Sequence, residues 1–288
     1  TSIINLYKYY YKNLTKEKIM FVYKRFMKFN FEKPNANLKF KDNEINILFY
    51  SEKKIFLSDN FNSQKNLLKL FKKIIKNESS NIILVRSEKG NFLLVQRKTL
   101  EKDLTYKYLE ELGGRIYNKI KTLGLSHAKI HENDILINER VALGIILSSY
   151  KFENYKKNKS KQIINLKNVI FVCNDPKKNL VKISEIQNLA KGVFTARDLV
   201  WQPPNILYPS SFANECKKLK KIGVKVTIYN EKQLQKIGME ALLAVGRGSR
   251  KDSRVVVMEW SGGIIVVYIS LLSIYKTYTG KGWTWKGR

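Results

Sequence analysis

The histidines are the first residues to consider for metal chemistry, because only two occur among the 288 residues. His127 and His131 stand four residues apart in the segment LSHAKIHEND. Such a pair shares a face of either a helix or a strand, so it could supply two ligands of a zinc site. The segment lacks the pattern His-Glu-x-x-His, and no cysteine or acidic residue is positioned to complete the site. We therefore interpret both histidines as ordinary surface residues.

The thiols offer a second kind of chemistry, nucleophilic attack. Cys173 and Cys216 are the two cysteines, and they stand far apart in apolar surroundings. Unpaired thiols without a secretory segment are typical of a reducing compartment, so we expect a cytoplasmic protein. Cysteines in apolar surroundings are more often small buried hydrophobes than nucleophiles, and we predict that role for both.

The charge of the chain limits its partners. Lys and Arg number 54 against 24 Asp and Glu, a formal net charge of +30. This excess predicts salt-sensitive, non-specific binding of nucleic acid or another polyanion. A second interpretation is compositional drift, which spreads lysine over the whole chain without any function. The apolar run 264–275 is too short to span a bilayer, and we expect no membrane contact.

The elements that would position these residues alternate between strand and helix patterns, which predicts an α/β fold. In the first part of the chain the expected strands cover 45–50, 81–87, 91–97 and 166–174, and the expected helices cover 63–77, 106–124, 137–157 and 180–200. The second and third strands form a hairpin with a turn at Lys89 and Gly90. The last helix bridges two domains.

One of these helices has a clear inward face. Leu109, Leu112, Ile116 and Ile120 repeat at helical spacing within 106–124. Gly113 and Gly114 interrupt the same helix, and each lowers its intrinsic stability by about 1 kcal/mol relative to alanine. We expect these glycines to allow close packing on a sheet.

The second part of the chain has signals for a loop, a helix, a strand, a second helix, a glycine-rich turn and another strand. Ser210 or Ser211 is expected to cap the helix FANECKKLKKIG, with Phe212, Cys216 and Leu219 facing inward. Asn230 and Gln233 have the spacing of a reciprocal cap for the helix EKQLQKIG. The glycines of AVGRGS lack phosphate-loop spacing, so a tight turn is expected there.

The same segment carries a family resemblance. The runs ARDLVWQPPN, YPSSFA, GVKVTIYNEKQLQKIGMEALLAVGRGS and RVVVMEWSGG occur in this order over about seventy residues. Together they resemble the entry into the catalytic domain of the leucyl aminopeptidases, the two-metal family also called cytosol aminopeptidases. Trp201 stands where the family usually has Asn, and Glu240 stands where Gly is usual. The helix with Gly113 and Gly114, and the run from ALG to SYKF, are similar to the small N-terminal domain of that family.

The resemblance implies hydrolysis of the peptide bond after an N-terminal residue, with two zinc or manganese ions activating a water molecule. It also implies peptide substrates, a homo-hexamer and an N-terminal domain like a macro domain. In the family, the first metal ligands lie in a segment like VGKGVTFDSGG. Aligned with TGKGWTWKGR, this segment places Lys281 at the position of a metal-binding lysine and Lys286 at the position of a metal-binding aspartate. A cation cannot ligate a cation, so this substitution is expected to disable the site.

The carboxylates needed for two metal ions are sparse. Residues 260–288 contain neither Asp nor Glu. The acidic residues of the resembling segment are Asp198, Glu215, Glu231, Glu240, Asp252 and Glu259, which stand singly. We expect most of them to be surface groups or partners in local pairs. This chain is therefore expected to hold no metal, to have no catalytic residues and to be inactive.

These observations predict a leucyl-aminopeptidase-like chain truncated within its catalytic domain. We expect a non-native extension at 1–26, with translation beginning at Met27, and an N-terminal α/β domain at 27–180. A linker helix and the start of an incomplete α/β/α catalytic domain would follow at 181–263, and a divergent tail, interpreted as a shifted reading frame, at 264–288. The alternatives are a basic nucleic-acid-binding module and a non-functional truncated product whose exposed apolar edge causes aggregation.

Overall fold

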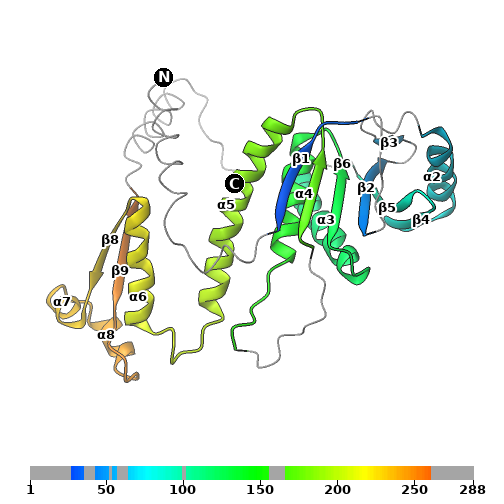
Figure 1. Ribbon diagram of the computed structural model, residues 1–288. Coiled ribbons are helices and arrows are strands. Elements are labelled where there is room, and N and C mark those ends of the chain that lie inside the picture. The colour runs from blue at the N-terminus through cyan, green and yellow to red at the C-terminus, as the bar shows by residue number, and fades with distance from the viewer. Residues whose placement is uncertain are drawn as a thin grey trace, which may run out of the picture. The chain divides into compact units, whose positions relative to one another are not determined.

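The computed structural model describes residues 27–35, 43–51, 54–56, 64–98, 102–155 and 166–260. The expected extension at 1–26 and the expected tail at 264–288 lie outside these residues, as does Lys281. The described residues divide into a first unit that ends at Trp201 and a second unit that begins at Gln202. Each unit is described below by itself (Figure 1).

A mostly parallel sheet is the centre of the first unit. Its strands are β1 (Lys28–Glu32), β2 (Glu44–Ser51), β3 (Lys54–Phe56), β4 (Ile82–Ser87), β5 (Gly90–Gln96), β6 (His127–His131) and β7 (Asn168–Val172). The order is β1-β7-β6-β2-β5-β4, with β3 paired to β2. Only the pairs β2–β3 and β4–β5 are antiparallel among the described strands of this sheet. The α/β fold and the hairpin with its turn before Gly90 agree with the sequence predictions.

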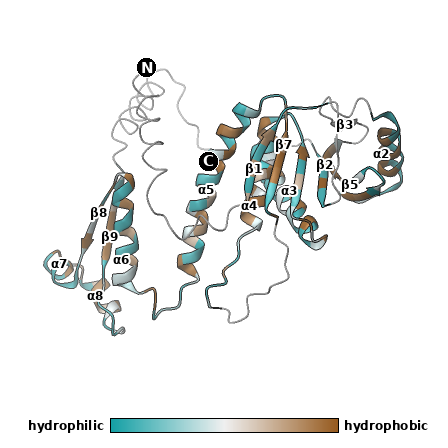
Figure 2. Ribbon diagram, viewed as in Figure 1, coloured by the Kyte–Doolittle hydropathy of each residue, from teal (hydrophilic) through white to brown (hydrophobic). Residues whose placement is uncertain are grey.

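Alternation along the strands gives the sheet two apolar faces. On β2, Ile47 and Phe49 contribute to one cluster, whereas Leu48 and Tyr50 contribute to another. Helices α3 (Lys102–Thr122) and α4 (Ile135–Ser148) cover the first face, and α2 (Lys65–Asn77) packs on the second. Figure 2 colours these helices and strands by hydropathy, with apolar positions in brown. Burial on two faces explains why β2 is apolar almost throughout.

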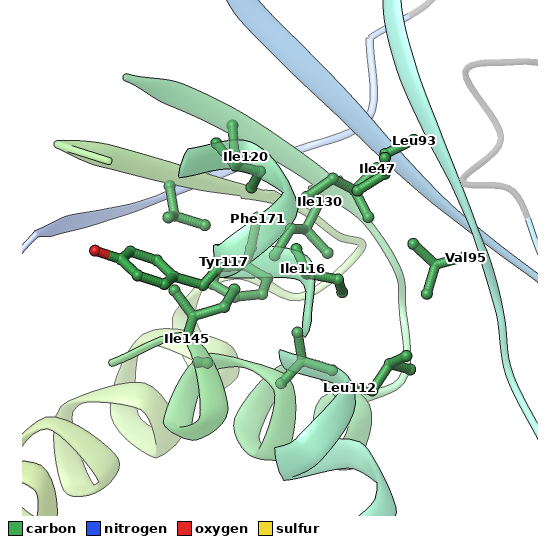
Figure 3. Packing of buried hydrophobic residues seen from close by; sticks show 14 of the residues in the cluster. Ile47, Leu93, Val95, Leu112, Ile116, Tyr117, Ile120, Ile130, Ile145 and Phe171 are labelled. Carbon is green, nitrogen blue, oxygen red and sulfur yellow. The ribbon is translucent and has the colours of Figure 1, made fainter. Parts of the chain in front are cut away.

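The larger cluster confirms the inward face predicted for α3. Its residues Leu109, Leu112, Ile116 and Ile120 are all at most 1% exposed. In Figure 3 the isoleucines of α3 lie among residues of the sheet and Ile145 of α4. Burying four such side chains contributes roughly 6–12 kcal/mol of transfer free energy, which offsets the two glycines in this helix.

Gly113 and Gly114 pack against a helix, so the prediction that they pack on a sheet was wrong. A methyl group on Gly113 would meet the backbone of Val141 and the Cα of Gly144, and one on Gly114 would meet Ser148. A methyl group on Gly144 would meet the backbone of Glu110. Helices α3 and α4 therefore cross with their backbones in direct contact.

Helix α5 (Pro176–Val200) is the longest described helix of the chain. It begins with a cap by Asp175, whose Oδ1 accepts a hydrogen bond from Lys178 N at 3.0 Å, and it packs on α4 through Ile186, Ala190 and Phe194. The expected helix at 137–157 ends earlier, at Ser148. Trp201, which departs from the family pattern, ends α5 and stacks on Phe152 with ring centroids 6.2 Å apart.

The elements of the second unit are α6 (Pro209–Lys217), the 3₁₀ helix η2 (Lys218–Ile222), β8 (Val224–Tyr229), α7 (Glu231–Lys236), α8 (Glu240–Gly246) and β9 (Val255–Trp260). The predicted order of helix, strand, helix and strand is present, whereas η2 and α8 were not predicted. Strands β8 and β9 form an antiparallel pair. Gly223 ends η2 with φ = 90°, a left-handed conformation that favours glycine.

The two predicted caps of this unit have different outcomes. Asn230 and Gln233 form the expected reciprocal cap, because each side chain accepts a hydrogen bond from the other's backbone N–H. The cap by Ser210 or Ser211 is wrong, since Tyr208 is the N-cap and Pro209 takes the first helical position, for which its fixed φ is suited. Phe212 is also 41% exposed, not inward as expected.

Among the helices in the described ranges, we find none that combines the length and the apolar character needed to cross a membrane.

Candidate functional site

The acidic residues of the segment that resembles a catalytic domain are engaged locally and do not converge. Glu240 lies exposed in the first turn of α8. The other five have short-range partners: Asp198 accepts from the Tyr150 hydroxyl at 2.9 Å, Glu215 pairs with Lys218 at 2.6 Å, Glu231 accepts from Ser253 N at 2.8 Å, Asp252 pairs with Arg254 at 3.2 Å and Glu259 pairs with Lys225 at 2.9 Å.

These residues do not fit a pair of divalent metal ions. Within the described ranges, no group of three or more His, Cys, Asp or Glu side chains could hold a metal ion. Two ions that share a water molecule need several oxygen ligands within a few ångströms, which locally paired carboxylates on separate elements do not provide. Metal binding by Lys281 remains a prediction, because that residue lies outside the described part of the chain.

His131 is buried, so the interpretation of both histidines as surface residues was wrong for this one. It lies on β6 on the same face as His127, and its exposed fraction is 0%. Its Nε2 lies 3.0 Å from Asn46 Oδ1 on the neighbouring strand β2. Burial, and secondarily the charge of Lys129, lowers the pKa of His131 to about 3. The ring is therefore neutral at physiological pH and is part of the fold of the sheet.

The cysteines are buried, as predicted. Cys173 follows β7 and is 0% exposed, and Cys216 lies on α6 and is 6% exposed. Burial raises the pKa of the Cys173 thiol to about 11, and it also raises the pKa of Cys216. Both thiols are protonated at neutral pH, which makes them poor nucleophiles.

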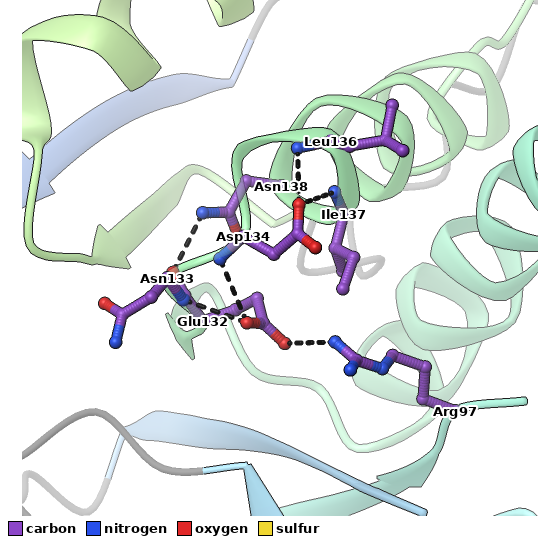
Figure 4. Close-up of polar contacts among 7 residues, drawn as sticks. All are labelled: Arg97, Glu132, Asn133, Asp134, Leu136, Ile137 and Asn138. Carbon is purple, nitrogen blue, oxygen red and sulfur yellow. Dashed lines mark hydrogen bonds and ion pairs between the residues drawn. The ribbon is translucent and has the colours of Figure 1, made fainter. Parts of the chain in front are cut away.

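A hydrogen-bonded polar cluster of the first unit lies at the carboxyl end of β6 (Figure 4). Glu132 is 6% exposed, and its Oε2 lies 3.2 Å from Arg97 Nη1. Its Oε1 accepts hydrogen bonds from the backbone N–H groups of Asn133 and Asp134 at 2.9 and 3.1 Å. Both carboxylate oxygens are thus occupied. Asp134 in turn caps α4 by accepting from the backbone N–H of Leu136 at 2.9 Å.

The same cluster joins the start of α4 to the start of α5. Asn138 donates from Nδ2 to Glu132 O at 2.9 Å and to Asn179 Oδ1 at 3.0 Å. Asn179 donates to Asp175 O at 3.0 Å, and Asn133 Oδ1 accepts from the backbone N–H of Asn174 at 3.1 Å. The loops that follow β6 and β7 are therefore held together by side-chain amides.

The electrostatics of this cluster indicate a positioning role. Burial raises the pKa of Glu132, whereas the two backbone N–H groups and the Arg97 charge oppose that rise. The three hydrogen bonds take up most of the roughly four acceptor sites of this carboxylate and hold the side chain in one position. The sequence analysis missed this cluster, although the polar run His-Glu-Asn-Asp directly after an apolar strand is a usable signal.

A hollow in the first unit is a weaker candidate. It has a volume of about 270 Å³ and is lined by Leu84, Arg86, Asn91, Leu123 and Leu125. Ligand pockets generally range from about 300 to 1,000 Å³ and contain several converging polar groups. With two polar side chains and a smaller volume, this hollow defines no binding site.

Sequence comparisons identify the class of protein. Residues 194–270 match the model of the catalytic domain of the cytosol aminopeptidase family. The probable cytosol aminopeptidase of Ehrlichia ruminantium (strain Gardel) is 37% identical over 158 residues, which are 53% of this chain and 31% of that protein. The probable cytosol aminopeptidase of Brucella melitensis biotype 1 is 48% identical over 125 residues, which are 42% of this chain and 26% of that protein.

Solved structures show the fold. A mutant of tomato leucine aminopeptidase covers 80% of this chain with a TM-score of 0.62 and 17% identity, and the chain covers 50% of that structure. The bottromycin maturation enzyme BotP in complex with Mn covers 76% with a TM-score of 0.54 and 18% identity, and the chain covers 45% of it. These structures show that the chain has an α/β fold like theirs.

The resemblance to the cytosol aminopeptidase family that the runs from ARDLVWQPPN to RVVVMEWSGG predict is confirmed by the match of residues 194–270 and by these relatives. It spans about a third or less of the length of the two curated relatives. The α/β fold class is also confirmed. The likeness of the first unit to a macro domain stays a prediction.

Proposed function

We propose that the complete protein to which this sequence corresponds releases N-terminal amino acids from peptides in a metal-dependent reaction. The observation that carries the proposal is the match of residues 194–270 to the catalytic-domain model. Within residues 202–260 the elements α6, β8, α7 and β9 follow the order of helix, strand, helix and strand predicted from the sequence signals. By the same resemblance we propose two zinc or manganese ions, a homo-hexamer, peptide substrates and a cytoplasmic location.

The described residues would contribute the scaffold of this enzyme, not its reacting groups. Within the described ranges no group of three or more His, Cys, Asp or Glu side chains could hold a metal ion, and Glu215 and Glu259 are paired with lysines. Strand β9 leaves Met258 and Trp260 50% and 68% exposed. A strand with exposed apolar residues in a two-stranded sheet needs further cover, which supports the proposal that this unit is the opening part of a larger domain.

We further propose that the 288-residue chain does not catalyse this reaction. The physical reason is the shortage of ligands, because residues 260–288 supply neither Asp nor Glu to join the scattered carboxylates. The domains would be those expected from the sequence, with the linker helix and the start of the catalytic domain at 181–263. Lys281 would be a single family ligand without its acidic neighbours.

The test is an assay of the purified 288-residue chain with a leucine anilide and with a leucine dipeptide, each in the presence of Zn²⁺ or Mn²⁺. The complete Ehrlichia ruminantium relative, assayed in parallel, is the comparison protein. We expect no release above the protein-free rate, and no bound metal by equilibrium dialysis. Metal-dependent release that a chelator abolishes, and that the substitution Lys281→Gln reduces, would contradict the proposal of inactivity.

A further inference from the structure

Three aromatic rings lie together on the surface of the first unit, at the end of α5. Phe152 stacks on Trp201 with ring centroids 6.2 Å apart, and Tyr155 packs against Phe152 with centroids 5.7 Å apart. Trp201 is 63% exposed, Tyr155 is 56% exposed and the adjacent Val200 is 83% exposed. These four residues are called the aromatic patch below. Neighbouring apolar side chains with this exposure are a feature of interaction surfaces.

Contacts beneath the aromatic patch hold its backbone in place. Tyr150 donates from its hydroxyl to Asp198 Oδ1 at 2.9 Å, and its ring packs on Phe194 with centroids 5.1 Å apart. Arg197 donates from Nη1 to Leu147 O at 3.1 Å, and its guanidinium lies 5.3 Å from the centre of the Tyr150 ring. The segment after α4 is thereby fastened to the end of α5. A surface that is already ordered loses little conformational freedom on binding.

The charges next to the aromatic patch cancel one another. Within residues 150–155 and 195–201 the charged side chains are Lys151, Glu153, Arg197 and Asp198. The whole chain has a net charge of +30, and directly after Tyr155 the sequence continues KKNKSK. The patch is therefore a neutral apolar surface on a strongly basic protein. A partner with an apolar interior beneath an anionic surface complements both properties.

The residue types and their exposure favour a lipid bilayer as this partner. Tryptophan and tyrosine are enriched where the hydrocarbon of a bilayer meets water, because each combines an apolar ring with one polar atom. Val200, Trp201 and Tyr155 each expose more than half of their surface, so they project outward and do not line a groove. Projecting side chains can enter the headgroup region of a bilayer directly, whereas a protein partner would need a matching hollow.

We propose that the aromatic patch binds the surface of an anionic lipid bilayer, with Tyr155, Val200 and Trp201 inserted at the level of the headgroups. The positive charge of the chain supplies the second attraction, since each basic residue near an anionic surface strengthens binding by about fivefold. Surface binding needs no spanning segment. It therefore departs from the expectation of no membrane contact, which rested on the length of the run 264–275. The proposed interaction is independent of peptidase activity.

The experiment measures sedimentation of the 288-residue chain with vesicles made of equal parts of phosphatidylcholine and phosphatidylserine. Trp201→Ala removes the exposed ring, and we expect vesicle affinity to fall by about tenfold or more. Val200→Asn places an amide at a position that is 83% exposed, where little packing is lost, and should also weaken binding. Trp201→Phe retains an apolar ring and should keep most of the binding. Circular dichroism checks that each variant is folded.

Trp260→Ala is the matched control. Trp260 lies on β9 in the second unit and is 68% exposed, so this variant removes the same residue type from a similar exposure outside the aromatic patch. We expect vesicle binding equal to that of the parent chain. Vesicles with brominated acyl chains give a direct readout, because bromine quenches tryptophan fluorescence at short range. Quenching should fall in Trp201→Phe and should persist in Trp260→Phe.

Four results would overturn the proposal. The first is a parent chain that does not bind the vesicles, and the second is an equal loss in Trp201→Ala and Trp260→Ala. The third is binding that Trp201→Ala and Val200→Asn leave unchanged, which would attribute it to net charge alone. The fourth is an oligomer that forms without vesicles and dissociates in Trp201→Ala, which would identify a second copy of the chain as the occupant. Binding that depends on Trp201 and Val200 but not on Trp260 supports the proposal.

Discussion

Replacing Gly144 by alanine tests whether the contact between α3 and α4 is as close as the structure shows. The added methyl group would lie 2.8 Å from the carbonyl carbon of Glu110 and closer still to its oxygen. Ordinary contact begins at about 3.4 Å, and both atoms belong to a backbone held inside a helix. The two helices would have to separate by at least about 0.6 Å along their shared apolar face.

The free energy follows from two opposing effects. Alanine favours the helix by about 1 kcal/mol over glycine, whereas forcing an extra methyl group into a packed core costs about 1–3 kcal/mol and sometimes more. Because the obstacle is backbone and not a flexible side chain, we place the cost at the upper end and expect a net loss of about 2 kcal/mol. With a urea m value of about 2 kcal/mol/M, the unfolding midpoint falls by about 1 M.

The matched control is Gly192→Ala on α5, where an added methyl group meets no atom within 4 Å. The same substitution there should raise the free energy of unfolding by about 0.5–1 kcal/mol, because only the helix preference changes. Urea unfolding followed by circular dichroism compares both variants with the parent chain. If Gly144→Ala were as stable as Gly192→Ala, the close crossing of α3 and α4 would be refuted.

Two further predictions concern single polar groups. Burial lowers the folded-state pKa of His131 to about 3. As pH falls below 6.5 the unfolded state therefore binds a proton that the folded state does not, and stability should fall by about 2 kcal/mol between pH 6.5 and 4.5. His131→Gln should lack this loss in urea unfolding at the two pH values; an unchanged pH dependence would contradict the burial of the ring. Asn230→Ala removes the cap of α7 and should destabilise the second unit by about 1 kcal/mol, which is measured as a lower melting temperature. Asn214→Ala at an exposed position should leave the melting temperature unchanged. Equal effects of both asparagine substitutions would contradict the capping role.

The parts of the fold that depend on local patterns could be predicted from the sequence. The spacing of Leu109, Leu112, Ile116 and Ile120 was sufficient to identify the buried face of α3, because four residues at helical period fix one side. The cap of Asn230 and Gln233 was predictable for the same reason, since both hydrogen bonds join residues three positions apart. The family could be predicted from the ordered runs between residues 196 and 263.

The features that depend on distant residues could not be predicted. The burial of His131 depends on Asn46, which is 85 positions away, and nothing near the histidine indicates this partner. Gly113 packs against α4 and not against the sheet. A glycine in a helix indicates that another element comes close, but the sequence does not identify that element. The cluster around Glu132 joins loops that meet only when β6 and β7 lie side by side.

The register of the first strand has a consequence for synthesis on the ribosome. Strand β1 pairs in parallel with β7, in a register that runs from Lys28 opposite Asn168 to Glu32 opposite Val172. The nascent polypeptide must grow by about 140 residues before this pairing can form, which takes roughly 7–28 s at 5–20 residues per second. In the folded chain Phe29 and Phe31 stack on Phe171, which is not yet synthesised during that interval. Chaperone binding during translation should therefore concentrate on this early segment.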